Sequence, residues 1–495
     1  MARAARPRSA RGPYLAGAAI ACAVADYLLW EWHFHDALAY AKGIYPLDDA
    51  DEWRYVACGR LVVHGYSLFQ DVFSAQPPLL FTSLAGGMKL FGDGEGGAHT
   101  TEVIFGLLGL LAAAWLAWEL GGMTAAAVTA ILLAISPAFL VYSHTIEAEG
   151  PMMALATLSL AILARHVASR NGWLPVIAGL ALAAAILTKL FAVETFLPAL
   201  WLLSIPPVSR RARLLDIAAF TGAATLPVVL EFLLISPAQQ WDQVIRLHNA
   251  AGAIAFAGAD PAASVLWRFL TFDAGLTLAA LGALGSLLVL RLYREAVFVF
   301  AWVGGTAVML LYFHPLFPHH PPILLTGLAC TAGIGVAASL ERLERRAWAR
   351  ALIATAGAVY LLLAPRLLHA DRHILSQGLA DNPALVAYIV RHTDARDLIA
   401  VDDLRLADES RRLVVPPLCD PSNVRLRAGY LTGSEAIQAT ERYRPKLVLF
   451  SFGIFTQVPG FGAWLDGHYR RQSLGGSSTA YLQTRHSTVV GGRRQ

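Results

Sequence analysis

The chain has 495 residues and a formal net charge of +4, and 56% of its residues are hydrophobic while only 15% are charged. This composition excludes an ordinary soluble globular protein and predicts a polytopic α-helical membrane protein. The four cysteines lie far apart in the sequence, so their spacing predicts neither a disulfide framework nor a zinc site.

The amino-terminal residues 1–12 carry four arginines ahead of an apolar run from about Tyr14 to Trp32. The run is long, it lacks a clear small-x-small cleavage site, and further apolar runs follow it. These features favour a start anchor over a cleaved signal peptide. We expect the basic end of this anchor to lie in the cytoplasm.

A polar stretch, Pro46–Pro78, separates this anchor from the rest of the apolar chain. Charge near a membrane span is costly, so the stretch is the first place to look for chemistry. The alternative interpretation is an acidic, solvated loop that only keeps this segment outside the bilayer. Four carboxylates fall within five residues here: Asp48, Asp49, Asp51 and Glu52.

Apolar residues recur at near-helical spacing from Asp51 to His64. The pattern predicts a short amphipathic helix along the membrane surface, capped by Asp49 or Asp51 and stopped at Gly65. A second helix is expected to open at Gln76-Pro77-Pro78 and to run to about 91.

Ten further apolar runs are long enough to cross a bilayer, which gives eleven with the first. Arginines gather in every second connection, and the positive-inside rule places these connections in the cytoplasm. Orientation therefore accounts for the basic charge, and no nucleic-acid partner is expected. An odd number of spans places the residues after 366 outside. The runs lie at roughly 100–120, 122–141, 150–166, 173–188, 190–206, 214–235, 273–291, 295–313, 321–340 and 350–366.

Residues 367–495 differ from the apolar part, residues 1–366, and are long enough for one small α/β domain. Strands are expected at Leu398–Val401, Leu447–Phe452 and Thr479–Gln483. Helices are expected at Pro383–His392 and at Ser434–Tyr443, the latter capped by Thr432 or Ser434.

Further polar groups fall at the predicted outer ends of spans, so with the acidic loop they converge on one external rim. Each also has a structural interpretation: Lys189 could snorkel, Pro151 could simply open a helix, and the histidine pair could be structural. Metal binding by the histidine pair alone is a weak signal. These groups are His144, Glu147, Glu149, Lys189, Asp242, His248, His314, His319 and His320.

The sequence contains no glycine-rich phosphate loop, Walker motif, nucleophile elbow or Cys/His metal spacing. Binding of a nucleotide-linked substrate by a Rossmann-type domain is therefore excluded. A substrate carried on a membrane lipid phosphate fits an outward-facing site better. The sequence requires no cofactor and allows a divalent cation.

The polar stretch resembles the first external loop of the GT-C membrane glycosyltransferases, in the protein O-mannosyltransferase and aminoarabinose transferase superfamily. Weaker similarities follow: His144 and Glu149 replace Arg and Asp of a Tyr-Ser-Arg…Asp-x-Pro motif, and His319-His320 resembles a late His-His or His-Tyr motif. Gln76 departs from the family, because many members have a lysine there that could meet a phosphate. The residues that match in order are Asp51-Glu52, Arg54-Tyr55, Asp71-Val72-Phe73 and Gln76-Pro77-Pro78.

The resemblance implies a transfer of sugar from a polyprenyl-phosphate carrier to a lipid, glycan or protein acceptor outside a bacterial cytoplasmic membrane. Asp51, in the external loop 33–99, is the expected base, and Arg54 and Lys189 would steady the leaving phosphate. Two alternatives stay open, a secondary transporter or lipid flippase and a catalytically idle relative. The residues expected to bind substrate are Glu52, Arg54, Tyr55, Asp71, Gln76, His144, Glu149, Lys189, His319 and His320.

Overall fold

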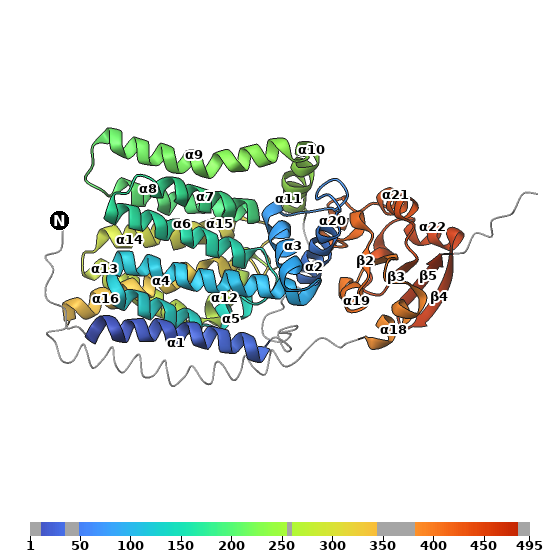
Figure 1. Cartoon of the computed structure of the whole chain (residues 1–495), viewed down its shortest axis with the longest axis horizontal. Helices are drawn as coiled ribbons and strands as arrows, with labels where there is room; N and C mark the ends of the chain where they lie inside the picture. The colour runs from blue at the N-terminus through green and yellow to red at the C-terminus, as the bar shows by residue number, and fades with distance from the viewer. Residues whose placement is uncertain (1–10, 35–48, 255–259, 344–381, 484–495) are drawn as a thin grey trace, which may run out of the picture.

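The computed structural model describes residues 11–34, 49–254, 260–343 and 382–483. Helices before residue 344 form an elongated bundle, and residues 382–483, called the tail domain below, lie against one end of it (Figure 1). The expected last span at 350–366, the boundary at 366 and the acidic residue Asp48 lie outside the described residues.

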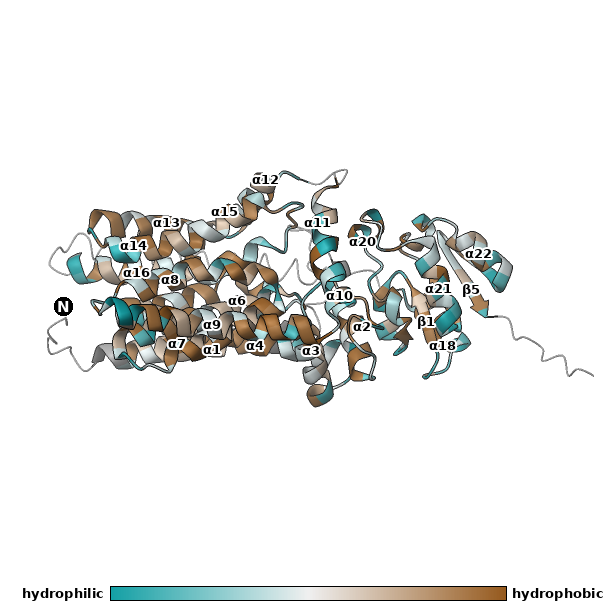
Figure 2. Ribbon diagram, turned by 90° about the horizontal axis from the view of Figure 1, so that it is seen from above, coloured by the Kyte–Doolittle hydropathy of each residue, from teal (hydrophilic) through white to brown (hydrophobic). Residues whose placement is uncertain are grey.

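The bundle is made of the apolar runs, and its helices are brown along most of their length in Figure 2. Lys189 has extended backbone angles and separates α7 from the short 3₁₀ helix η2. The segments are α1 (Arg11–Phe34), α4 (Glu95–Ala134), α5 (Pro137–Tyr142), α6 (Glu149–Ser169), α7 (Leu174–Thr188), η2 (Leu190–Thr195), α8 (Phe196–Ser204), α9 (Arg210–Leu234), α12 (Ala262–Phe272), α13 (Ala274–Val289), α14 (Tyr293–Val299), η4 (Phe300–Gly304), α15 (Gly305–Tyr312), η5 (Pro321–Leu324) and α16 (Leu325–Leu343).

Among the described residues, five helices are long and apolar enough to cross a membrane. A sixth is added if α12 and α13, which meet at 95°, form one broken span. The multi-pass architecture is thus confirmed, while the count of eleven spans stays a prediction. Within α4 the backbone of Gly122 is non-helical, with φ 82° and ψ −175°. Glycine tolerates this conformation, so two helices meet here, between the runs expected at 100–120 and 122–141.

In the bundle, α4 packs against α1, α6 and α16, while α7 packs between α6 and α9. Small residues allow these close approaches: a Cβ atom on Gly179 of α7 would lie only 2.4 Å from the carbonyl oxygen of Phe220 in α9. The apolar core therefore runs the length of the bundle, and α9 lies at its edge (Figure 1).

Four short helices lie between the bundle and the tail domain: α2 (Asp49–Val63), α3 (Pro78–Phe91), α10 (Pro237–Gln240) and α11 (Leu247–Gly252) (Figure 1). A π-helical turn, η3 (Trp241–Arg246), joins the last two. The second helix of the polar stretch begins at Pro78, as expected. However, α2 begins two residues before Asp51, and it is buried on nearly all sides instead of lying exposed along a surface.

The tail domain contains a five-stranded mixed sheet in the order β2-β1-β3-β5-β4. Strands β2, β1 and β3 are parallel, and β5 and β4 complete the sheet as antiparallel strands. Thr432 caps α21 in a capping box with Glu435, which confirms one of the two expected caps. The elements are α18 (Pro383–His392), β1 (Leu398–Val401), α19 (Leu404–Glu409), β2 (Leu413–Val414), η6 (Pro416–Leu418), α20 (Asn423–Arg427), α21 (Gly433–Tyr443), β3 (Leu447–Phe450), η7 (Phe455–Gln457), α22 (Phe461–His468), β4 (Tyr469–Gly475) and β5 (Ser478–Gln483).

The two faces of this sheet have different partners. One face packs against α21 and α22 within the tail domain. The other face shares a buried apolar cluster with α18, α19 and the juxtamembrane helices α2 and α3, where Val56 and Leu61 are fully buried. The polar stretch and the tail domain are therefore held together by a common core.

Candidate active site

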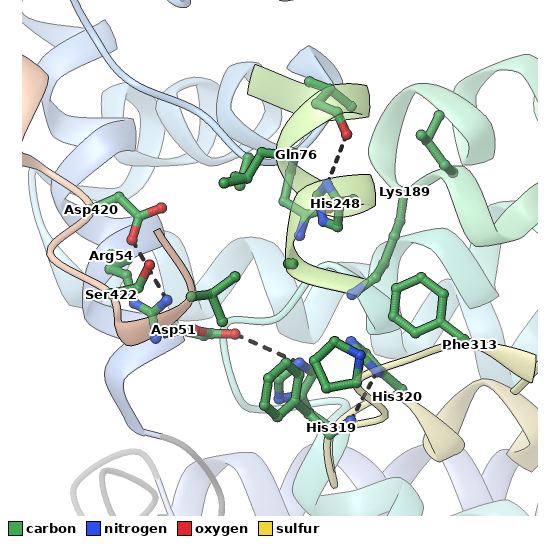
Figure 3. A pocket seen from close by; sticks show the side chains of 18 of the residues that line it. Asp51, Arg54, Gln76, Lys189, His248, Phe313, His319, His320, Asp420 and Ser422 are labelled. Atoms are coloured by element: carbon green, nitrogen blue, oxygen red, sulfur yellow. Dashed lines mark hydrogen bonds and ion pairs between the residues drawn. The ribbon is translucent and has the colours of Figure 1, made fainter. Parts of the chain in front are cut away.

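A cavity of about 670 Å³ lies where the end of the bundle meets the tail domain. Its walls come from α2, residues 73–77, the start of η2, helices α11 and α12, the turn 313–320, and residues 420–427 of the tail domain. Figure 3 shows that charged side chains from these separate elements point into one space. Apolar side chains such as Phe313 line it on the bundle side.

Asp51 lies in the first turn of α2 and lines the cavity. The i,i+3 spacing places Arg54 beside it, and the two form an ion pair. Arg54 Nη1 also lies 3.6 Å from Asp420 Oδ1 in the tail domain, and His319 Nε2 lies 3.6 Å from Asp51 Oδ2 (Figure 3). Burial raises the pKa of Asp51, and the charge of Arg54 opposes that shift.

Lys189 reaches the same cavity from the break between α7 and η2. Its ammonium forms a buried ion pair with Glu149 Oε1 at the start of α6. Nζ also lies 5.1 Å from the centre of the Phe191 ring, which is within the range of a cation–π contact. His320 Nε2 lies 3.9 Å from Glu149 Oε1. The lysine is thus engaged by a carboxylate and does not simply snorkel to a surface.

His319 connects two groups of side chains that could each hold a metal ion. One group is Asp51, Glu147 and His319, and the other is Glu149, His319 and His320; within each, the ligand atoms lie within 4.8 Å of one another. Oε2 of Glu147 and Oε2 of Glu149 are buried and make no hydrogen bond within the described residues. Carboxylate and imidazole donors with unsatisfied oxygens suit a divalent cation such as zinc or manganese.

Gln76 and Tyr55 line the cavity near Asp51, and Gln76 Nε2 donates to Tyr55 Oη at 3.4 Å. Burial raises the pKa of Tyr55 well above its usual value, and the neighbouring carboxylates add to the shift. The amide of Gln76 therefore occupies a cavity wall without supplying charge, as the departure from the family pattern led us to expect.

Four of the expected site residues lie outside the cavity wall. Glu149 is one of them, and it is linked to the cavity through its ion pair with Lys189. The other three make their contacts elsewhere. Glu52 faces away from the cavity, where its Oε1 lies 3.0 Å from His99 Nε2. His144 is buried, and its carbonyl oxygen lies 2.7 Å from His99 Nδ1. Asp71 binds the tail domain, because its Oδ1 accepts hydrogen bonds of 3.1 Å from Arg442 and from the Tyr443 hydroxyl. Direct contact with substrate in this cavity is therefore not supported for these three residues.

Sequence reasoning assigned no site role to several residues that the structure brings to the cavity or close to Asp51. His248 lines the cavity, and Glu147 has a ligand atom within 4.8 Å of those of Asp51 and His319. Both were grouped with the polar rim but given no function. Asp420, Ser422 and Arg427 also line the cavity, but no motif marks them, because their segment follows no pattern of spacing or periodicity. The only available signal was for Glu147, which lies two residues before Glu149 in a turn between helices.

Residues 75–241 match the model of a family described as dolichyl-phosphate-mannose-protein mannosyltransferase. No curated protein matches the chain by sequence. The matched range contains Gln76, Glu149 and Lys189, while Asp51 and His319 lie outside it.

Two solved structures resemble nearly the whole chain. ArnT from Cupriavidus metallidurans bound to undecaprenyl phosphate is 18% identical, with a TM-score of 0.64, and the alignment covers 97% of this chain and 99% of that one. The archaeal oligosaccharyltransferase AglB from Archaeoglobus fulgidus, in complex with an inhibitory peptide and a dolichol-phosphate, is 13% identical with a TM-score of 0.54, covering 98% and 76%. AglB has also been solved with Zn and sulfate, at 12% identity and a TM-score of 0.53, covering 94% and 73%. This chain has the fold of the ArnT-like GT-C membrane glycosyltransferases.

Proposed function

We propose that this chain is a membrane glycosyltransferase that moves a hexosyl or pentosyl group from a polyprenyl-phosphate carrier to a lipid, glycan or protein acceptor. The observation that carries this proposal is the cavity at the end of the apolar bundle. It combines a carboxylate, Asp51, whose side chain is only 14% exposed, with the cations Arg54 and Lys189. A binding site for a lipid-linked phosphate needs apolar surface next to the lipid chain and cations next to the phosphate.

The ligands of the similar structures support a lipid-phosphate donor, since ArnT holds undecaprenyl phosphate and AglB holds a dolichol-phosphate. The inhibitory peptide in the AglB complex supports an acceptor bound in addition to the donor.

In the proposed step, Asp51 accepts the proton of an acceptor hydroxyl as the acceptor oxygen bonds to the anomeric carbon of the sugar. The bond from that carbon to the phosphate oxygen breaks, and the phosphate leaves with the electron pair. A single direct displacement of this kind inverts the anomeric centre. If the acceptor is itself a phosphate, Asp51 acts as an electrostatic partner instead.

Arg54 and Lys189 would hold the leaving phosphate. Both cations are already paired, Arg54 with Asp51 and Lys189 with Glu149. Arginine offers five N–H donors and lysine three, so each can keep a carboxylate and still donate to a phosphate oxygen. Tyr55 and Gln76 would orient the sugar from the neighbouring wall.

A divalent cation fits the carboxylate and imidazole groups around His319. Bound there, it would supply positive charge next to the phosphate. Holding the ion through Glu149, His319 and His320 would leave Asp51 available as the base. Holding it through Asp51, Glu147 and His319 would make Asp51 a ligand. Metal content in Glu147→Gln and His320→Ala variants distinguishes the two arrangements, because each variant removes a ligand from only one group.

We place the cavity and the tail domain outside the cytoplasmic membrane, with the amino terminus inside. The arginines in the first turn of α9 support this orientation, because this end of α9 lies at the end of the bundle opposite the tail domain (Figure 1).

The proposal is tested by incubating purified full-length protein in detergent with labelled polyprenyl-phosphate sugars and scoring transfer or hydrolysis. Release of the labelled sugar with inversion supports the proposal. Movement of intact lipid-linked sugar across a vesicle membrane, without cleavage, would instead establish the flippase alternative. Absence of both, in protein that still binds the donor, would establish an idle relative.

A further inference from the structure

Two cysteines that lie 361 residues apart in the sequence meet at the contact between α2 and the tail domain. Cys58 lies on α2, Cys419 follows η6, and their sulfur atoms are 2.8 Å apart. Both side chains are buried, and both sulfurs also face the carbonyl oxygen of Phe73. Non-bonded heavy atoms prefer about 3.5–4.0 Å, so the two sulfurs are closer than an ordinary packing contact allows.

We propose that Cys58 and Cys419 form a disulfide that joins the juxtamembrane helix α2 to the tail domain. The inference rests on the outer placement given under the proposed function, because disulfides persist in oxidising compartments outside the cytoplasm. The spacing of the cysteines in the sequence did not indicate this pairing.

The bond forms by thiol–disulfide exchange with a disulfide-bearing oxidant of that compartment. One cysteine, as a thiolate, attacks the oxidant and gives a mixed disulfide. The second thiolate displaces the oxidant, which takes up the two protons lost by the cysteine thiols and leaves as a dithiol. Burial raises the pKa of Cys58 well above its usual value, which disfavours the thiolate once the surfaces are packed. The exchange therefore takes place as the tail domain docks, and the finished bond is shielded.

The position of the pair ties it to the candidate active site. Cys58 lines the cavity, one helical turn after Arg54 and Tyr55. Cys419 immediately precedes Asp420, which lines the cavity from the tail domain and lies 3.6 Å from Arg54. A covalent link here fixes the distance between the two walls, and so it acts as a positioning element for the groups that meet the substrate.

The test counts thiols in full-length protein isolated without reductant. The protein is denatured in a polyethylene-glycol maleimide, and each free thiol adds one gel shift. We expect two shifts, from Cys22 and Cys330, and four after prior reduction, since the chain has four cysteines. Peptide mapping should recover one peptide pair joined through Cys58 and Cys419. Both measurements use the wild-type protein and do not depend on transferase activity.

Two variants sharpen the result. In a Cys22→Ser, Cys330→Ser background, the isolated protein should show no shift before reduction and two after it. Adding Cys58→Ser should leave one shift, from Cys419, before reduction.

Four shifts in unreduced wild-type protein would overturn the proposal, and so would a bond that appears only after oxidised glutathione is added to the purified protein. The outcome is separate from the proposed activity. A chain that transfers sugar with four free thiols refutes the disulfide alone, and an oxidised chain without transfer refutes the activity alone.

Discussion

Replacing Asp51 with asparagine tests the proposed base most directly. The change keeps the size of a side chain that is only 14% exposed, and it keeps a hydrogen-bond acceptor for Arg54. It removes the charge and the capacity to take a proton. Arg54 would retain Asp420, 3.6 Å away, so donor binding and folding should change little.

The expected loss follows from the role assigned to Asp51. A positioned general base contributes a factor of roughly 10²–10⁴ to turnover. At about 1.36 kcal/mol for each factor of ten, that is about 2.7–5.4 kcal/mol of transition-state stabilisation. Arg54 and Lys189, the groups assigned to donor binding, are unchanged in the variant. Turnover should therefore fall while donor affinity stays near that of the wild type.

Glu52→Gln is a matched control, because Glu52 is the next residue on α2 and is also buried, but it contacts His99 instead of the cavity. The assay compares initial transfer rates at saturating donor on equal amounts of folded, membrane-extracted protein. Near-normal turnover in Asp51→Asn, together with loss of turnover in Glu149→Gln, would refute the assignment and move the base to the other side of the cavity.

Four further predictions concern other parts of the molecule. Lys189→Ala should weaken binding of a labelled polyprenyl phosphate while Lys189→Arg keeps part of it. The alanine variant also leaves Glu149 buried without its partner, which should cost about 3–5 kcal/mol of stability. The Lys189→Ala, Glu149→Gln double variant is therefore the folding control, and wild-type donor affinity in this double variant would contradict a donor-binding role for Lys189. If a divalent cation is resident, His319→Ala should remove it from purified protein by elemental analysis, whereas equal metal content in wild type and variant would exclude both ligand groups. Asp71→Asn should cost at most about 1 kcal/mol of stability in chemical denaturation, because its ion pair with the tail domain is solvent-exposed, and should keep turnover within twofold; a loss above tenfold would mean that Asp71 meets the substrate. A reporter fused after residue 366 should read external and one at Arg211 internal, and a cytoplasmic tail would remove the case for an external site.

The parts of the site that could be predicted are those marked by local sequence patterns, such as the ends of apolar runs, charges beside a span and prolines at a helix start. Lys189 and His319 each lie at the end or break of an apolar run, so run lengths alone place them near one end of the bundle. The acidic loop was recognisable because charge is rare beside membrane spans. The second helix of the polar stretch was marked by its prolines.

The remaining parts depend on which surfaces dock, and a single sequence does not carry that information. Neighbouring residues on a helix point about 100° apart, so Asp51 and Glu52 could not be separated without knowing which side of α2 the tail domain covers. For the same reason, α2 was expected to expose a polar face, but Arg60 is buried in contact with Asp93 and Asp408. Asp420 was not predicted, because only docking brings it to Arg54.

The walls of the cavity come from two regions of the chain that can change independently. The groups assigned to the donor, Arg54 and Lys189, belong to the first two hundred residues, whereas residues 420–427 belong to the tail domain. Within that tail segment, Asp420 lies 3.6 Å from Arg54, whereas Ser422 and Arg427 also line the cavity. Substitutions at Ser422 and Arg427 therefore alter one side of the cavity and keep the Asp420 carboxylate. If the proposed function holds, we expect that exchanging residues 421–427 for those of another chain of this fold changes the acceptor, while Asp420 keeps its contact with Arg54.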